Sequence, residues 1–212
     1  MQLTHLGHSA VLVQTGSVRM LIDPGNLSDA WHGLTDLDAV LVTHQHADHI
    51  DPENAAALVT ANPAAKVLVE PSVLDAVPLA GAEAFGTGST ATLGDITVTA
   101  VGGQHAIIHA DLPTFGNVGL VLSAAGEPTL FHPGDALAAI PAGIDVLAVP
   151  AYGPWAAMKE TIDFVRAVGA PQGFCVHDRL LAEPGFQLVN GRLGAMSGTE
   201  MLDLRGGQPH SF

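Results

Sequence analysis

The stretch Thr43-His44-Gln45-His46-Ala47-Asp48-His49 directly follows the apolar run Ala39-Val40-Leu41-Val42. Alternate residues of a strand point to the same side, so the first two histidines can meet on one ion while the chain is still extended. The aspartate and the last histidine lie where residues 50–53 predict a turn into a helix, so they can reach a second ion. The stretch therefore predicts half of a two-metal site. The alternative, a solvated polar loop, leaves this density of histidines unexplained.

Four further residues of metal-binding type stand at the ends of predicted strands or in turns. Asp23 ends the run 19–22, His105 follows a pair of glycines, Asp135 lies in a Gly-Asp turn, and His177 ends the run 173–176. Together with the His-x-His-x-Asp-His motif, their order along the chain resembles the metallo-β-lactamase-fold hydrolases. The resemblance extends over about residues 3 to 180.

This resemblance implies seven metal ligands that bind two divalent ions. His44, His46 and His105 would bind one ion, Asp48, His49 and His177 the other, and Asp135 would bridge the two. Asp23 is expected to hydrogen-bond a ligand imidazole without binding metal, and His132 is expected to support Asp135. An Asp at position 135, where the antibiotic-degrading lactamases have Cys, resembles the hydrolase branches that take Zn, Mn or Fe. We expect Zn, and because a carboxylate is a harder ligand than a thiolate, Mn and Fe remain alternatives.

The opening Thr4–Ala10, followed by Leu21–Pro24, is similar to the branch that includes ascorbate-6-phosphate lactonase-like enzymes and uncharacterised metal-dependent hydrolases. The implied activity is hydrolysis of a small ester, lactone or phosphodiester by a metal-bridging hydroxide, with Asp48 as the catalytic proton shuttle. Two alternatives remain open: iron-dependent redox chemistry on thiols or oxygen, and a non-catalytic metal-binding protein. The chain has no Gly-x-Ser-x-Gly elbow, so a serine nucleophile is unsupported.

The candidate substrate contacts are His8, His109, Tyr152 and Arg179. His8 and His109 are each as consistent with a structural or exposed-loop role as with a pocket role. Tyr152, with Trp155, could line the cleft or anchor a loop. Arg179 could hold an anionic group of the substrate or be an ordinary surface arginine.

The composition limits the classes of partner. The 212 residues include 21 acidic and 7 basic side chains, a formal net charge of −14. Such a charge repels phosphate backbones and anionic membrane surfaces, so we expect a small-molecule substrate and neither nucleic acid nor membrane as a partner. The sequence has no apolar run of membrane-spanning length and no basic leader with an apolar stretch, so a cytoplasmic location is expected. The 48% hydrophobic content would also suit a homo-oligomer.

Apolar periodicity predicts an α/β protein of short strands and few helices. The expected strands are 2–6, 10–15, 18–22, 39–42, 66–70, 96–100, 117–123, 128–132, 145–149 and 173–177, and the expected helices are 53–59, 71–77 and 155–169. Two strand-rich halves are consistent with several α/β folds, and the resemblance implies one of them, a four-layer αββα sandwich with two mixed sheets flanked by helices. We expect a single domain over residues 1–212, with no assignable motif after Gly185. The lone Cys175 is interpreted as a thiol near the metals or, more in keeping with its apolar neighbours, as a small buried residue.

Overall fold

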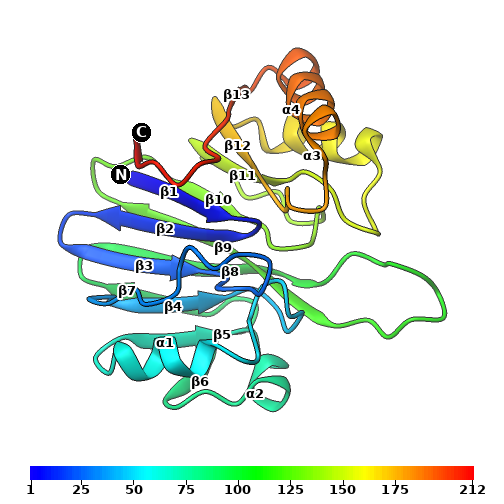
Figure 1. Cartoon of the computed structure of the whole chain (residues 1–212). Coiled ribbons are helices and arrows are strands. Elements are labelled where there is room, and N and C mark those ends of the chain that lie inside the picture. The colour runs from blue at the N-terminus through cyan, green and yellow to red at the C-terminus, as the bar shows by residue number, and fades with distance from the viewer.

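The computed structural model describes all residues from 1 to 212 (Figure 1). In chain order, the first half contains β1 (Gln2–Gly7), β2 (Ala10–Thr15), β3 (Val18–Ile22), β4 (Ala39–Val42), α1 (Ala55–Ala61), β5 (Lys66–Val69), α2 (Val73–Ala76) and β6 (Ala82–Ala84). The second half contains β7 (Thr90–Leu93), β8 (Ile96–Gln104), β9 (Gly116–Ala124), β10 (Leu130–His132), β11 (Val146–Pro150), α3 (Met158–Val168), β12 (Gln172–Val176), α4 (Glu183–Ser197), β13 (Glu200–Leu202) and β14 (His210–Ser211).

The strands form two seven-stranded sheets with the same internal plan. The first sheet has the order β14-β1-β2-β3-β4-β5-β6 and the second the order β13-β12-β11-β10-β9-β8-β7. In the first sheet the pairings are antiparallel from β14 to β3 and parallel from β3 to β6. In the second they are antiparallel from β7 to β10 and parallel from β10 to β13. Both sheets are therefore mixed, as expected.

Three apolar layers separate the sheets and the helices. The central layer packs side chains of the first sheet, such as Leu41, against side chains of the second, such as Leu120. On the outer face of the first sheet, Val40 packs with residues of α1 and α2. On the outer face of the second sheet, Phe131 packs with Phe164 of α3 and with residues of α4. The predicted αββα sandwich is confirmed, and Figure 1 shows the two helix pairs at opposite ends of the view.

Burial on both faces explains why β4 has no polar alternation. Ala39 and Leu41 face the second sheet, while Val40 and Val42 face the helices, and all four side chains are buried. A strand covered on both faces is expected to be continuously apolar. The first polar residues can appear only where the strand leaves the two apolar layers, which is where the metal-binding motif begins.

The segment after Gly185 forms structure that the sequence did not predict. Its first part, residues 186–197, belongs to α4, whose buried side chains Phe186, Val189 and Leu193 face the second sheet. Gly191 and Gly194 lower its helix propensity, so packing against the sheet outweighs local preference here. The short strands β6, β7, β13 and β14 were not predicted either, because two to four residues carry too little periodicity.

The C-terminal segment connects the two sheets. β13 pairs with β12 in the second sheet, whereas β14 pairs with β1 in the first, with Ser211 opposite Gln2 and His210 opposite Leu3. Residues 203–209 pass from one sheet to the other, and both ends of the chain lie side by side in Figure 1. None of the helices is long and apolar enough to span a bilayer.

Candidate metal centre

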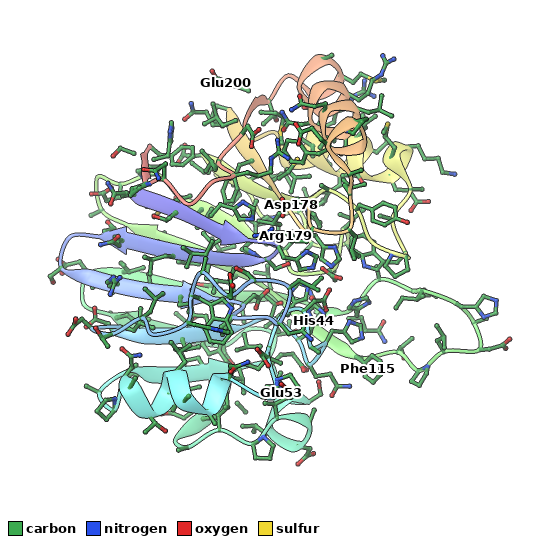
Figure 2. All side chains as sticks on the ribbon, viewed as in Figure 1. His44, Glu53, Phe115, Asp178, Arg179 and Glu200 are labelled. Atoms are coloured by element: carbon green, nitrogen blue, oxygen red, sulfur yellow. The ribbon has the colours of Figure 1, made fainter.

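The loop after β4 contributes four of the predicted ligands. His44 Nε2 and His46 Nδ1 lie 3.1 Å apart, as the two-residue spacing on an extended chain predicts. The backbone N–H groups of His49 and Ile50 both donate to the carbonyl of His46, at 2.9 and 3.0 Å. This turn reverses the chain and brings Asp48 and His49 back toward the strand end. Figure 2 shows His44 in the interior, near the base of the protruding loop where Phe115 lies.

The second half contributes its predicted ligands one at a time. His105 follows β8, Asp135 follows β10 by three residues, and His177 follows β12. Asp135 is oriented by Asn117, whose Oδ1 accepts the Asp135 backbone N–H at 2.9 Å while its Nδ2 donates to the carbonyl of Pro133 at 2.9 Å. Three strand ends far apart in the sequence thus meet the loop from the first half.

The side chains gather in two groups, in each of which the candidate ligand atoms lie within 4.8 Å of one another. One group comprises His44, His46, His105 and Asp135, and the other comprises His8, Asp48, His49 and His177. Asp135 also contacts the second group: its Oδ1 is 3.2 Å from His49 Nε2 and its Oδ2 is 3.2 Å from His177 Nε2. All seven residues predicted as ligands are brought together, and His8 joins them.

Several of these atoms are buried without a hydrogen-bond partner. They include Nε2 of His105, both ring nitrogens of His177 and Oδ1 of Asp135. The Nδ1–H of His105 donates to the carbonyl of Ala106 at 2.6 Å, which leaves Nε2 as a lone pair aimed at the group. Buried lone pairs without donors are costly. Imidazole nitrogens and carboxylates converging in this way form a donor set that fits divalent cations.

Asp23 fixes the orientation of one predicted ligand. The Nδ1–H of His49 donates to Asp23 Oδ2 at 2.7 Å, which leaves His49 Nε2 free to face Asp135. Thr43 donates its backbone N–H and its hydroxyl to the same carboxylate, at 2.8 and 2.7 Å. The role of Thr43 was not predicted, although it is the first residue of the motif.

Two further side chains hold Asp135 in place. The ring of His132 spans from the carbonyl of Ser9, at 3.3 Å, to the backbone N–H of Gly134, also at 3.3 Å, so it supports the turn before Asp135. Trp155 donates its Nε1–H to Asp135 Oδ2 at 3.0 Å. Neither this contact nor that of Asn117 had a signal in the sequence, because both partners come from other strands or loops.

The electrostatic environment keeps both carboxylates ionised. Burial alone would raise the pKa of Asp135, but His49 and the contacts with His105 and His177 hold this pKa well below its usual range. The pKa of Asp48 is likewise lowered, because its contacts with His177 and His8 outweigh burial. Burial lowers the pKa of His44 well below its usual value, so this imidazole stays neutral and able to bind a metal. Burial would also lower the pKa of His177, but its carboxylate partners raise it to about 9.

The backbone at the site is strained. Left-handed φ angles occur at His8 (53°), Asp23 (49°) and His177 (58°), and outside the site only at Asp36 among the residues that are not glycine. Each such residue costs on the order of 1 kcal/mol or more, so the surrounding contacts must hold it in place. Gly25 shows how tight the packing is, because a Cβ there would lie 1.8 Å from the carbonyl oxygen of Asp48.

The residues predicted to contact substrate are placed in different surroundings. His8 is buried beside the ligands, with Nε2 3.0 Å from Asp48 Oδ2 and Nδ1 3.4 Å from the backbone N–H of Arg179. The Arg179 side chain is exposed beside Gly7 and forms no ion pair with a carboxylate. His109 is exposed on the loop between β8 and β9, 3.6 Å from Asp111. Tyr152 is exposed on the loop after β11.

Cys175 lies away from the ligands. It is buried in the apolar layer between the second sheet and its helices, with Sγ 3.5 Å from Asn190 Oδ1. Two residues apart on a strand would place Cys175 and His177 on the same face, but β12 ends at Val176 and His177 adopts a left-handed conformation, so this alternation does not reach His177. The interpretation of Cys175 as a small buried residue is confirmed.

Comparison with protein families gives a match to the model described as beta-lactamase superfamily domain, over residues 2–172. Protein Rv0786c of Mycobacterium tuberculosis is 40% identical over 202 residues, which cover 94% of this chain and 94% of that protein. A UPF0173 metal-dependent hydrolase of Azorhizobium caulinodans is 36% identical over 154 residues. This second match spans 64% of the chain and only 63% of the relative.

Solved structures share the architecture at low sequence identity. The metallo-beta-lactamase fold protein YhfI of Bacillus subtilis superposes with a TM-score of 0.75 at 16% identity, over 100% of this chain and 99% of that one. A likeness at this identity concerns the fold alone. It agrees with the αββα layers and the sheet orders described above.

Proposed function

The chain belongs to the beta-lactamase superfamily, and on this premise we propose that it is a binuclear metal-dependent hydrolase of a small ester, lactone or phosphodiester. The observation that carries the proposal is the position of Asp135, whose two carboxylate oxygens face histidines of both groups. A carboxylate in this position is suited to holding two cations side by side. Zn is the metal we propose, with Mn or Fe as alternatives, because the donors mix imidazole and carboxylate.

His44, His46 and His105 would hold one ion, Asp48, His49 and His177 the other, and Asp135 both. When bound, two such ions lower the pKa of a shared water toward neutrality and so supply a hydroxide nucleophile. The buried Asp135 side chain, 4% exposed, can only serve the ions. The Asp48 side chain is 24% exposed, so it can also meet a substrate and carry a proton to the leaving group.

His8 has a defined part in this proposal, which is to position Asp48. The backbone N–H of Arg179 donates to His8 Nδ1, so His8 Nε2 carries the proton and donates it in a hydrogen bond to Asp48 Oδ2. This bond fixes one carboxylate oxygen and leaves the other for the ion or the substrate. The left-handed φ of His8 and the burial of its side chain hold the ring in this orientation.

The test combines metal content with turnover. The purified protein, stripped with a chelator and reloaded with Zn, Mn or Fe, is assayed by elemental analysis and with a panel of aryl esters, lactones and phosphodiesters. We expect two ions per chain and turnover that requires them, and we expect His46→Ala to lose the ion of its own group and, with it, turnover. Ala56→Ser, at an exposed position of α1, is the matched control.

Two outcomes would contradict the proposal. Full turnover by a metal-free protein would remove the ions from the chemistry. Oxygen consumption by the iron-loaded protein, with no hydrolysis of any panel member, would favour the redox alternative instead. A charge of −14 supports a small-molecule substrate over a nucleic acid in either case.

A further inference from the structure

A groove of about 680 Å³ opens beside the metal centre, between α3, the end of β8 and the loop 136–140. Most of its lining residues are apolar, among them Leu137 and Phe164. Its volume lies within the range of small-molecule sites in proteins, and apolar walls with a few polar groups are typical of such sites.

The groove is continuous with the metal centre. His105 and Trp155 both line it, and both contact the same oxygen of Asp135: His105 Nε2 lies 3.4 Å and Trp155 Nε1 3.0 Å from Oδ2. The two rings are 6.2 Å apart in an edge-to-face arrangement. A molecule whose reacting group lies at the ligands would therefore extend its next atoms along this groove.

Large apolar side chains at the groove are left exposed to water. Ile107, on the loop between β8 and β9 that protrudes in Figure 1, is 70% exposed, and Ile140, on the opposite wall, is 46% exposed. Apolar side chains that line a concave surface and border polar residues mark a binding site more often than an ordinary surface. These two side chains would be covered by an apolar ligand.

The two carboxylates that line the groove give it a negative charge, although one of them, Asp163, lies 3.8 Å from Arg166, a residue outside the lining. Glu160 and Asp163 of α3 are exposed and line it, and no lysine or arginine does. The basic side chain proposed from the sequence for an anionic group, Arg179, is not among the lining residues. An arm that ends in a carboxylate or phosphate would be repelled here.

We propose that this groove binds an uncharged aliphatic arm of the substrate, which makes the substrates apolar esters or lactones. The inference rests on the proposed function, because the group to be hydrolysed must lie at the metal ligands. It adds the class of substrate, and it assigns Ile107, Ile140 and Phe164 as the side chains that select it.

The first experiment measures how turnover depends on chain length. The metal-loaded protein is assayed with 4-nitrophenyl acetate, butyrate, hexanoate and octanoate, and with the 4-nitrophenyl monoester of a dicarboxylic acid as an arm with a terminal charge. We expect kcat/KM to rise about two- to fourfold per methylene as far as hexanoate, since each buried methylene favours transfer out of water. We expect the terminally charged ester to fall below the acetate.

The second experiment blocks the groove. Ala167, an exposed residue of α3, lines it, so Ala167→Trp should remove the dependence of kcat/KM on chain length. Ala56→Trp places the same side chain at an exposed position of α1, at the other end of the molecule in Figure 1. This control should change neither the dependence of kcat/KM on chain length nor the turnover of the acetate.

A binding measurement separates this inference from the proposed function. Saturation-transfer NMR with 1-octanol should show binding to the wild-type protein and to Ala56→Trp, and none to Ala167→Trp. Turnover that is flat across chain lengths, together with no octanol binding, would overturn the inference while leaving the hydrolase intact. Octanol binding without turnover of any ester, lactone or phosphodiester would instead support the groove and contradict the proposed function. A wild-type protein that is dimeric and binds no octanol, with Ala167→Trp monomeric, would overturn the inference, because a second copy of the chain would then cover the groove.

Discussion

The two halves of the molecule have the same strand plan but supply the metal centre in different ways. In the first half, four of the predicted ligands come from one loop after β4, whose own backbone turn brings them together, while Asp23 and His8 orient two of their side chains. In the second half, three ligands come from the ends of β8, β10 and β12. Asp135, the one that contacts both groups, is oriented by residues distant in the sequence, Asn117 and Trp155.

This difference shows two ways of building one site. A loop whose geometry is local can be shaped by its own turn, whereas the scattered ligands depend on the register of a whole sheet. The second half should therefore respond more strongly to changes in distant packing, and the first half to changes within the loop. Four sets of substitutions, taken from the largest expected effect to the smallest, test this contrast.

Asp135→Ala is expected to have the largest effect. It removes the only carboxylate that faces both groups and leaves His49 and His177 without their buried partner. Loss of an outer hydrogen-bond partner alone costs about 10- to 100-fold in metal affinity, so we expect a loss of more than about 100-fold at both ions. Equilibrium dialysis with elemental analysis measures it, and two retained ions would refute the bridging position. His46→Ala, in the first half, should weaken mainly the ion of its own group.

Asp23→Asn compares the supporting residues of the two halves. The amide keeps the shape, but its NH2 group cannot accept. One of the two sides of the carboxylate, which faces the Thr43 backbone N–H on one oxygen and His49 with the Thr43 hydroxyl on the other, therefore loses its bonds, and we expect about 10- to 100-fold weaker metal binding. Asn117→Ala, its counterpart in the second half, loses two hydrogen bonds to backbone groups and should cost about 1–3 kcal/mol of unfolding free energy. Metal titration and urea denaturation distinguish the two. Equal effects of both variants on metal affinity would contradict the contrast between the halves.

Gly25→Ala tests how closely the first-half loop is packed. A Cβ at this position would overlap the backbone of Asp48, so the loop must shift, at a cost of about 1–3 kcal/mol in unfolding free energy. Gly191, in α4 of the second half, has open space around it, and Gly191→Ala should stabilise by up to about 1 kcal/mol through helix propensity. Chemical denaturation checks both. An unchanged midpoint for Gly25→Ala would show that the loop is more adaptable than its contacts indicate.

The smallest effect is expected from Cys175, close to His177 in sequence but in another layer. Burial raises the pKa of this thiol to about 12, so the folded protein keeps the proton at pH values where the unfolded chain loses it. Stability is therefore fully present below about pH 8.5 and decreases as the pH rises through the range up to about 12. Between pH 8 and 10 we expect a loss of about 1–2 kcal/mol that is absent in Cys175→Ala, measured by urea denaturation. Identical pH dependence in the two proteins would contradict the burial of the thiol.

The sequence by itself predicted the local features of the metal centre, whereas the tertiary arrangement of its ligands was predicted only through the resemblance to the metallo-β-lactamase fold. The loop from His44 to His49 could be interpreted directly, because the spacing of its ligands follows from strand and turn geometry. Nothing around Asp135 or His177 is distinctive by itself, so only their order along the chain indicated them. The hydrogen bonds of Asn117 and Trp155 to Asp135 depend on how strands and loops meet, and no local pattern encodes that. In the same way α4 escaped prediction, since the packing of Phe186 and Leu193 outweighs its glycines.

The pairing of β14 with β1 has a consequence for how the protein is made. Residues 2–3 leave the ribosome early, but their partners at 210–211 follow only after the whole intervening chain has been translated. Until then the edge of the first sheet exposes unpaired backbone groups, which is a state that invites association between nascent chains. We therefore expect chaperone demand during synthesis to be highest just before the last strand emerges.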